Sequence, residues 1–466
     1  MNDVIENRTF DEIEIGETAS LVRQLTERDI QLFAVMSGDV NPAHVDPEYA
    51  RDDQFHQIIG HGMWTGSLIS TVLGTQLPGP GTIYRDQSLH FAGAVRPGDT
   101  VTVKVRAQEK RPESSVVVFD CECIRQDGCV VVSGTAEVEA PRGKIRRDRI
   151  SLPNVTLQDR GAKLRALIEQ AKPDGPLPMA VVHPVDSASL LGAVAAAEAG
   201  LIDPLLVGPE GKIVQAAETA GIDISPYRLV STEHSHAATG RAVELVNAGE
   251  AQSLMKGKLH TDELMAAVIA KDSGLRTERR ISHAFVMDVP DYAKPILITD
   301  AAINIAPDLE AKADIIRNAI DLARAIDMDD PKVAILSAVE TVSPKMVSTL
   351  HAAALCKMAD RKQIEGGTLD GPLAFDNAIS IEAAKVKGIS SNVAGRAEVL
   401  VAPDLEAGNM LAKQLEYMGN AKAAGLALGT RVPIALTSRA DDDLSRMASC
   451  ALALKLHRFR HGVSRA

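Results

Sequence analysis

The chain has 466 residues, which is longer than one ordinary hydrophobic core and predicts two or three domains. Its formal net charge of -12 argues against a general surface for nucleic acid or acidic membranes, so an anionic ligand must be met by local basic groups. Five cysteines are too few for a disulfide framework, and we expect buried thiols and no metal site.

Residues 1–6 carry neither a basic region nor an apolar core, so we expect no signal peptide. No uninterrupted apolar run approaches about 18 residues, the length that spans a bilayer. We therefore expect a cytoplasmic protein that binds neither membrane nor nucleic acid.

The first 140 residues combine a buried helix with a run of strands. Thr26 is placed to cap a helix through about Met36, and the apolar run 63–73 predicts a second, buried helix. Four β-rich segments then follow, separated by turns that contain Gly or Pro, at 88–91, 100–107, 115–125 and 130–139. This order predicts an α+β domain.

A short polar motif precedes the buried helix, at Gly38-Asp39-Val40-Asn41-Pro42-Ala43-His44 and His61-Gly62-Met63. Asp39 could accept a proton from water, and His44 could orient that water or return a proton to substrate. The N–H of Gly62, at the start of the helix, would point at a developing oxyanion. The alternative is an Asx-type turn in which Asp39 and Asn41 only satisfy neighbouring backbone groups.

These paired motifs resemble the MaoC-like (R)-specific enoyl-CoA hydratase family over about residues 8–140, and 87–91 and 95–99 match its pattern as well. The resemblance implies a hot-dog fold and syn hydration of a trans-2-enoyl-CoA to the (3R)-hydroxyacyl-CoA. It also implies that Asp39 and His44 hold the catalytic water and that Gly62 polarises the thioester carbonyl. Asn41 would contact the substrate.

Residues 141–149 are basic and contain Pro and Gly, which is typical of a solvated joint. We expect domains at 1–140 and 159–466 with a linker at 141–158. A nucleic-acid-binding arm is disfavoured because no aromatic residues interleave the charges.

From Met179 strands and helices alternate, beginning with a βαβ unit over 179–208 whose helix is capped by Asp186. This pattern predicts an α/β domain. Neither a Rossmann fingerprint nor a P-loop is present, so a nicotinamide oxidoreductase is poorly supported. Polar clusters instead follow the predicted strands, where open α/β sheets bind ligands, at 255–261, 279–283, 299–304 and 437–441.

As an ordered set, these clusters and the stretches 183–186, 298–308, 370–376 and 403–409 resemble the phosphate acetyl/butyryltransferase family over about 160–466. The resemblance implies a two-lobed, isopropylmalate-dehydrogenase-like α/β fold, commonly in dimers or larger oligomers. It implies reversible acyl transfer between coenzyme A and inorganic phosphate, with no bound cofactor.

The same resemblance assigns roles to residues of this half. Ser438 would orient the reacting groups, Arg439 would stabilise the developing negative charge and Arg280 would grip phosphate. Further pocket residues by this matching are Lys256, Thr261, Asp300 and Asn304. The general base stays open among Asp441, Asp442 and Asp443, and Asp443 is the candidate that we carry forward.

Both halves would handle acyl-CoA thioesters, which gives their fusion a chemical reason. Two alternatives stay open at this point. The N-terminal domain could only bind acyl-CoA or drive assembly, and the C-terminal half could be a metal-dependent dehydrogenase of related two-lobed shape.

Overall fold

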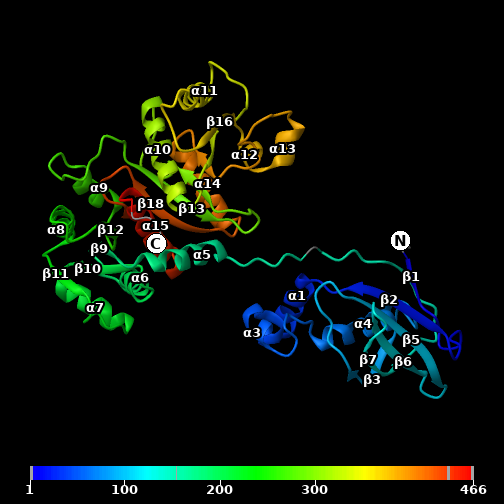
Figure 1. Ribbon diagram of the computed structural model, residues 1–466. Coiled ribbons are helices and arrows are strands. Elements are labelled where there is room, and N and C mark those ends of the chain that lie inside the picture. The colour runs from blue at the N-terminus through cyan, green and yellow to red at the C-terminus, as the bar shows by residue number, and fades with distance from the viewer. Residues whose placement is uncertain (1–3, 154, 438–440, 463–466) are drawn as a thin grey trace. The chain divides into compact units, whose positions relative to one another are not determined.

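A computed structural model describes residues 4–153, 155–437 and 441–462, and it divides into two compact units, Met1–Leu157 and Gln158–Ala466. Each unit has its own hydrophobic core, so we describe each by itself (Figure 1). Within the described residues, every helix is too short or too polar to cross a lipid bilayer.

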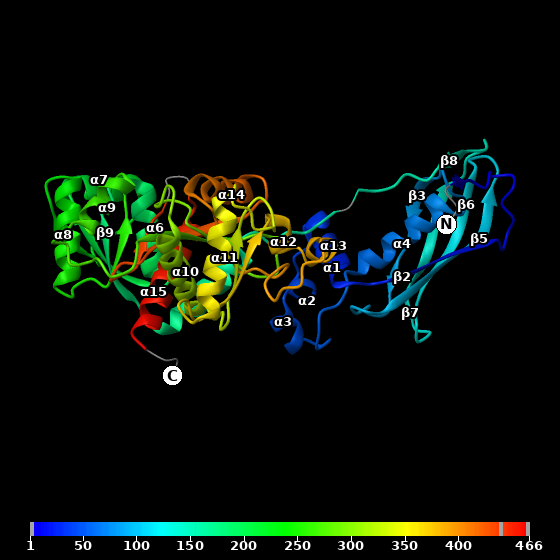
Figure 2. The same ribbon diagram turned by 90° about the horizontal axis from the view of Figure 1, so that it is seen from above.

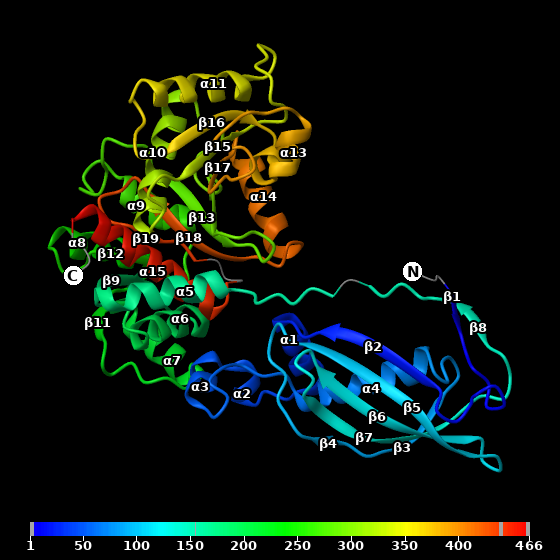
Figure 3. The same cartoon turned by 45° about the vertical axis from the view of Figure 1, so that its right-hand side comes forward.

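The N-terminal unit is an antiparallel sheet curved around one apolar helix, α4 (Figure 3). The strand order is β2-β5-β6-β7-β3, and β4 also pairs with β7. The elements are β1 Val4–Glu6, β2 Thr18–Gln24, α1 Glu27–Ser37, α2 Pro42–Val45, α3 Pro47–Asp52, α4 Gly62–Thr75, β3 Ile83–Gln87, β4 His90–Phe91, β5 Thr100–Arg111, β6 Val116–Arg125, β7 Val130–Glu139 and β8 Arg146–Asp148.

Alternation along β5 explains how the sheet buries one face. Val101, Val103 and Val105 are fully buried, whereas the residues between them are half-buried or exposed. These valines pack in one core with Ile69 and Val72 of α4. The predicted helix, meander and α+β class are therefore confirmed, and β3 is an additional strand that the sequence did not predict.

Two cysteines of β6 belong to this core. Cys121 and Cys123 are fully buried, and burial raises the pKa of each thiol to about 12. They are inert packing groups, as expected, but Cys129 is exposed.

The segment from α1 to α3 carries the polar motif. Thr26 and Asp29 form a capping box at the start of α1, and Gly38 ends the helix in the left-handed conformation, with φ 75°. Pro42 and Pro47 each stand in the first turn of the next short helix. The chain is thus turned sharply between Gly38 and Pro42, at Asp39.

The linker predicted at 141–158 is shorter in the structure. Strand β8 pairs with β1, and the side chain of Asn7 bonds to the backbone of Gly143 and Ile145, at 2.9 and 2.7 Å. The N-terminal unit therefore retains the chain as far as Asp148. The sequence missed this pairing because Arg146-Arg147-Asp148 has no apolar alternation.

Among the described residues, eleven strands form one sheet in the C-terminal unit, in the order β11-β10-β9-β12-β19-β18-β13-β14-β17-β15-β16. Figure 3 labels most of these strands, and Figure 2 shows the helices around them. The elements are α5 Ala162–Ala171, a 3-10 turn Lys172–Asp174, β9 Leu177–Val182, α6 Ser187–Glu198, β10 Ile202–Gly208, α7 Glu210–Ala220, β11 Arg228–Ser231, α8 Ser235–Asn247, β12 Ser253–Lys256, α9 Thr261–Ile269, β13 Ser282–Asp288, β14 Ile296–Thr299, α10 Leu309–Ala325, β15 Lys332–Leu336, α11 Val347–Asp360, β16 Thr368–Leu373, α12 Phe375–Ile379, α13 Ile381–Val386, β17 Val399–Val401, α14 Leu405–Tyr417, β18 Lys422–Leu428, β19 Ile434–Ala435 and α15 Asp443–Arg460.

The sheet consists of two parallel halves joined by antiparallel strands. Strands β11 to β19 are parallel, β18 and β13 run against their neighbours, and β14 to β16 are parallel again. Helix α15 contacts α5, α6, α10 and β18, and most of its residues are buried. One helix thus packs against elements of both halves, and the α/β class is confirmed.

We expect the two cores to unfold independently. Phe119 is fully buried in the N-terminal unit, so Phe119→Ala should destabilise that unit by about 3–5 kcal/mol. Trp64 is the chain's one tryptophan and lies in the same core, so its fluorescence during urea unfolding reports this unit. Val22→Ala, at an exposed position, is the control. If Phe119→Ala shifted the unfolding transitions of both units equally, the two cores would not unfold independently.

Candidate active sites

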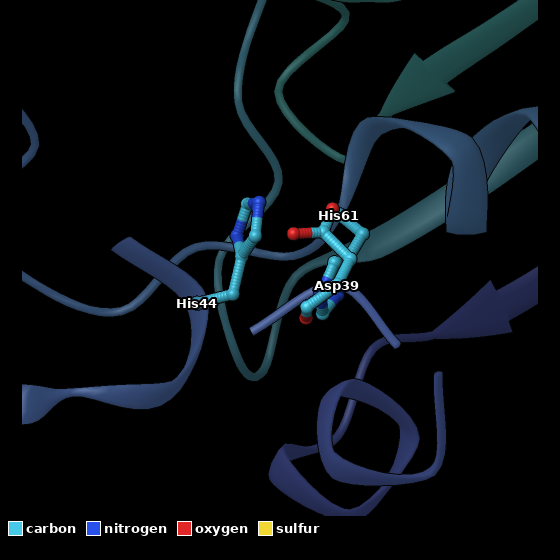
Figure 4. Close-up of side chains that lie close together, drawn as sticks. All are labelled: Asp39, His44 and His61. Carbon is cyan, nitrogen blue, oxygen red and sulfur yellow. The ribbon is translucent and has the colours of Figure 1, made fainter. Parts of the chain in front are cut away.

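The polar motif of the N-terminal unit gathers Asp39, His44 and His61 in one place (Figure 4). Asp39 is exposed on the turn after α1, and its Oδ1 accepts a bond from the Asn41 N–H at 3.2 Å. Asn41 in turn caps α2 by accepting from Ala43 N–H at 3.2 Å. Asn41 therefore has the local turn role that the alternative interpretation gave it, and Asp39 combines that role with an exposed carboxylate.

Both histidines are fixed by backbone carbonyls. Nδ1 of His44 lies 2.9 Å from the carbonyl oxygen of Ile59, and Nε2 of His61 lies 3.1 Å from that of Asp39. The two rings lie 4.0 Å apart. A hydrogen on Nδ1 of His44 satisfies Ile59 and leaves the Nε2 lone pair for a water molecule or substrate.

Gly62 is the first residue of α4, as the sequence predicts, and it is exposed. Within the described residues, its N–H has no backbone acceptor, which is the ordinary condition of a first-turn N–H. A Cβ added here would lie 3.1 Å from the ring of Phe91, so a side chain would crowd the donor. The motif thus offers a carboxylate, an imidazole and a backbone donor.

A cleft of about 830 Å³ opens in the C-terminal unit between the segments 276–281 and 303–314. Arg280 and Asn304 line it, and their contact with substrate stays a prediction. Two further arginines, Arg276 and Arg279, line it as well, and sequence reasoning gave neither a role. The cluster at 279–283 was the signal that could have found Arg279.

The Arg280 guanidinium is held by an amide. Its Nε donates to Oδ1 of Asn304 at 3.0 Å, while its backbone N–H donates to Asp314 at 2.9 Å. Among the described residues, no carboxylate forms an ion pair with this guanidinium, whereas Arg279 is paired with Asp321 at 2.6 Å. Arg280 therefore keeps its positive charge for an anion in the cleft.

Asp300 lies behind this pair rather than on the cleft wall. It is 2% exposed, and its two oxygens accept bonds from the backbone of Ala302, Ile303 and Asn304 and from the Asn304 side chain. The sequence predicted that Asp300 lines the pocket. In the structure this carboxylate is buried, and both of its oxygens are bonded to N–H donors of its own loop. Asp300 instead positions Asn304, which positions Arg280.

The other predicted residues that the structure describes do not line this cleft. Within the described residues, neither Lys256 nor Thr261 lines the cleft, because Lys256 is buried at the end of β12 and Thr261 begins α9. Ser438 and Arg439 lie outside the described residues.

Asp443 is exposed in the first turn of α15, and the preceding Asp442 caps that helix. Burial acts to raise the pKa of Asp442, but bonds from Lys422 and Ser445 outweigh it and lower that pKa.

A second cavity of about 620 Å³ lies in the C-terminal unit at the carboxyl ends of β9 and β12. The chain order reverses between these neighbouring strands, which is where open α/β sheets bind ligands. Its lining includes His183, Lys212, Lys258 and His260.

Comparison with known proteins identifies the two units. Residues 231–454 match the family model described as phosphate acetyl/butaryl transferase. A phosphate acetyltransferase from Rhizobium meliloti is 60% identical over 292 residues, which cover 63% of this chain and 92% of that protein. The chain belongs to the phosphate acetyl/butyryl transferase family.

Other comparisons agree with this family and add the second domain. A branched-chain phosphotransacylase structure from Enterococcus faecalis is 30% identical, with a TM-score of 0.54, over 60% of this chain and 99% of that one. Residues 12–121 match the MaoC like domain model. An (R)-hydratase structure from Pseudomonas aeruginosa is 41% identical over 33% of this chain and 99% of its own, with a TM-score of 0.32. By the family models, the chain is a phosphate acetyl/butyryl transferase family member with a MaoC-like hot-dog domain, and the isopropylmalate-dehydrogenase likeness stays a prediction.

For this transferase family member, we expect Asn304→Ala to loosen Arg280. The change removes a hydrogen bond to a charged group, so kcat/KM for phosphate should fall by about tenfold or more. Arsenate-dependent breakdown of acetyl-CoA measures the corresponding value for arsenate, which takes the place of phosphate in this assay. Asn409→Ala is a matched control, because Asn409 bonds to the same loop at Ala301 O, at 3.1 Å, without contacting Arg280. Equal losses in both variants would contradict the positioning role.

Proposed function

We propose that the chain is a bifunctional enzyme of acyl-CoA metabolism. Its C-terminal unit catalyses reversible acyl transfer between coenzyme A and inorganic phosphate, and its MaoC-like unit hydrates trans-2-enoyl-CoA to the (3R)-hydroxyacyl-CoA. Coenzyme A thioesters and phosphate are the substrates, and no bound cofactor is required. The homo-oligomer, a dimer or larger, stays a prediction.

The observation that carries the transferase proposal is the arginine held by an amide in the cleft, in a chain of this family. In acyl transfer the coenzyme A thiolate attacks the carbonyl carbon of an acyl phosphate. A carbon–sulfur bond forms, the carbon–oxygen bond to phosphate breaks, and phosphate leaves with the negative charge. A fixed cation is therefore needed where phosphate departs, and the planar fork of Arg280 suits its oxygens.

The thiol must also lose its proton, and the carbonyl must be polarised. The resemblance assigns the orientation of the reacting groups to Ser438 and the stabilisation of the developing negative charge to Arg439, and both assignments stay predictions. The base stays open between Asp441 and Asp443. Asp442 is less suitable, because its lowered pKa makes it a weak proton acceptor.

We expect Arg280→Lys to keep the charge but lose the fork, and to retain part of the activity. Arg280→Ala should cost about 3 kcal/mol of transition-state stabilisation, the range found when one preorganised donor is removed. Arsenolysis of acetyl-CoA and butyryl-CoA measures both variants and the acyl preference. If Arg280→Ala raises only KM for arsenate and leaves kcat intact, the residue is a ground-state anchor, and Arg439 becomes the better candidate for transition-state charge.

The hydratase proposal is supported by two observations in a MaoC-like domain: Asp39 and His44 lie together with His61, and Gly62, which follows His61, begins α4. Asp39 would take a proton from a water molecule that His44 Nε2 holds, and the hydroxide would add to C3 of the enoyl group. The Gly62 N–H would stabilise the enolate oxygen of the thioester, and a proton returned to C2 completes the addition.

The alternative is a MaoC-like domain that binds acyl-CoA or drives assembly without catalysis. One observation favours it, since Asp39 Oδ1 already serves the Asn41 N–H and is partly accounted for by turn formation. The two functions differ in their need for a basic carboxylate.

Asp39→Asn separates the alternatives. An amide oxygen can still accept the turn hydrogen bond but is not a base, so hydration of crotonyl-CoA should fall by about 10²-fold or more. Absorbance of the enoyl thioester follows the reaction. Arsenolysis by the same preparation should be unchanged, which shows that the protein is folded. Wild-type hydration by this variant would contradict the assignment, and absence of hydration in the unmodified chain would favour the binding domain.

A further inference from the structure

Asp39, His44 and His61 bring together three side chains of the types that bind transition metals. One carboxylate oxygen and one nitrogen from each imidazole lie within 4.8 Å of one another. All three side chains appear together in Figure 4. Carboxylate and imidazole are ordinary zinc ligands, and a set of three leaves a fourth position open to water.

His61 provides an independent sign of an unused ligand atom. The residue is 2% exposed, and among the described residues its Nδ1 is a buried ring nitrogen with no hydrogen-bond partner. A buried polar atom without a partner costs free energy, so such atoms are uncommon in folded proteins. A metal ion would satisfy a nitrogen lone pair here.

The backbone contacts of both histidines also match those of metal ligands. A ligating histidine usually donates its second ring N–H to a carbonyl or carboxylate, which fixes the ring and its tautomer. Nδ1 of His44 faces the Ile59 carbonyl at 2.9 Å, and Nε2 of His61 faces the Asp39 carbonyl at 3.1 Å. Each neutral ring therefore keeps one lone pair for which the described residues offer no partner.

We propose that Asp39, His44 and His61 form a binding site for Zn²⁺ in the MaoC-like domain. From the sequence we expected no metal site because we considered only the cysteines, and residues 39, 44 and 61 follow no familiar ligand spacing that would have pointed to them. A second part of the proposal concerns hydration and rests on the proposed hydratase function. The bound ion occupies the Asp39 oxygen and the His44 nitrogen that would hold the catalytic water, so it inhibits hydration and leaves acyl transfer unaffected.

Isothermal titration calorimetry of the full chain with Zn²⁺, in a phosphate-free buffer, tests binding without reference to activity. Asp39→Asn, His44→Ala and His61→Gln should each weaken the tightest site by about tenfold or more. His56→Asn is the matched control, because His56 is an exposed histidine of the same unit and Asn tolerates its positive φ of 59°. Mg²⁺ should give no comparable signal, since it prefers oxygen ligands.

Equal zinc affinity in the wild type, the three ligand variants and the control would overturn the site. In the activity arm, crotonyl-CoA hydration should fall with zinc occupancy and recover with a chelator, while arsenolysis in the same samples stays constant. Hydration that is unchanged or increased at full occupancy would overturn the inhibition. A chain without hydratase activity would contradict the proposed function, yet calorimetry would still decide the zinc site.

Discussion

Asp300 is a buried carboxylate on which the transferase cleft depends. Its two oxygens accept N–H bonds from Ala302, Ile303 and Asn304 and from the Asn304 side chain, so its charge is dispersed over one tight turn. A charge that is 2% exposed is costly unless it is bonded in this way. The turn fixes Asn304, and Asn304 fixes the Arg280 guanidinium in the cleft.

In the MaoC-like domain the corresponding carboxylate is exposed instead of buried. Asp39 is exposed on its turn, while His61 beneath it is buried and has a pKa lowered mainly by burial. An exposed carboxylate is open to water and substrate, whereas a buried one bonded on both oxygens is not. This difference explains why we assign Asp39 to chemistry and Asp300 to positioning, although Asp39 accepts one backbone N–H bond and Asp300 accepts three.

The sequence predicts a site better when its residues lie close together along the chain. Asp39, His44 and Gly62 lie within 24 residues and around one helix start, so local capping and turn rules place them correctly. Arg280 and Asn304 come from different segments, and only a family resemblance brought them together. The sequence did not predict that Asp300 and Lys256 are buried. Its pattern shows that polar residues follow the strands, but not which way their side chains face. Strand β18, Lys-Ala-Ala-Gly-Leu-Ala-Leu, was missed because Ala and Gly have low strand propensity.

The transferase cleft is lined by charges of both signs. The chain is acidic overall, and the cleft itself contains Asp308, Glu310 and Asp314 as well as its arginines. Neutralising every arginine with a carboxylate would leave nothing to attract phosphate, and an arginine without a partner would be poorly fixed. Bonding Arg280 to a neutral amide fixes the guanidinium while keeping its charge. The neighbouring Arg279, paired with Asp321, supplies rigidity instead. Two adjacent arginines thus differ in function because of their partners, a distinction that residue type alone does not carry.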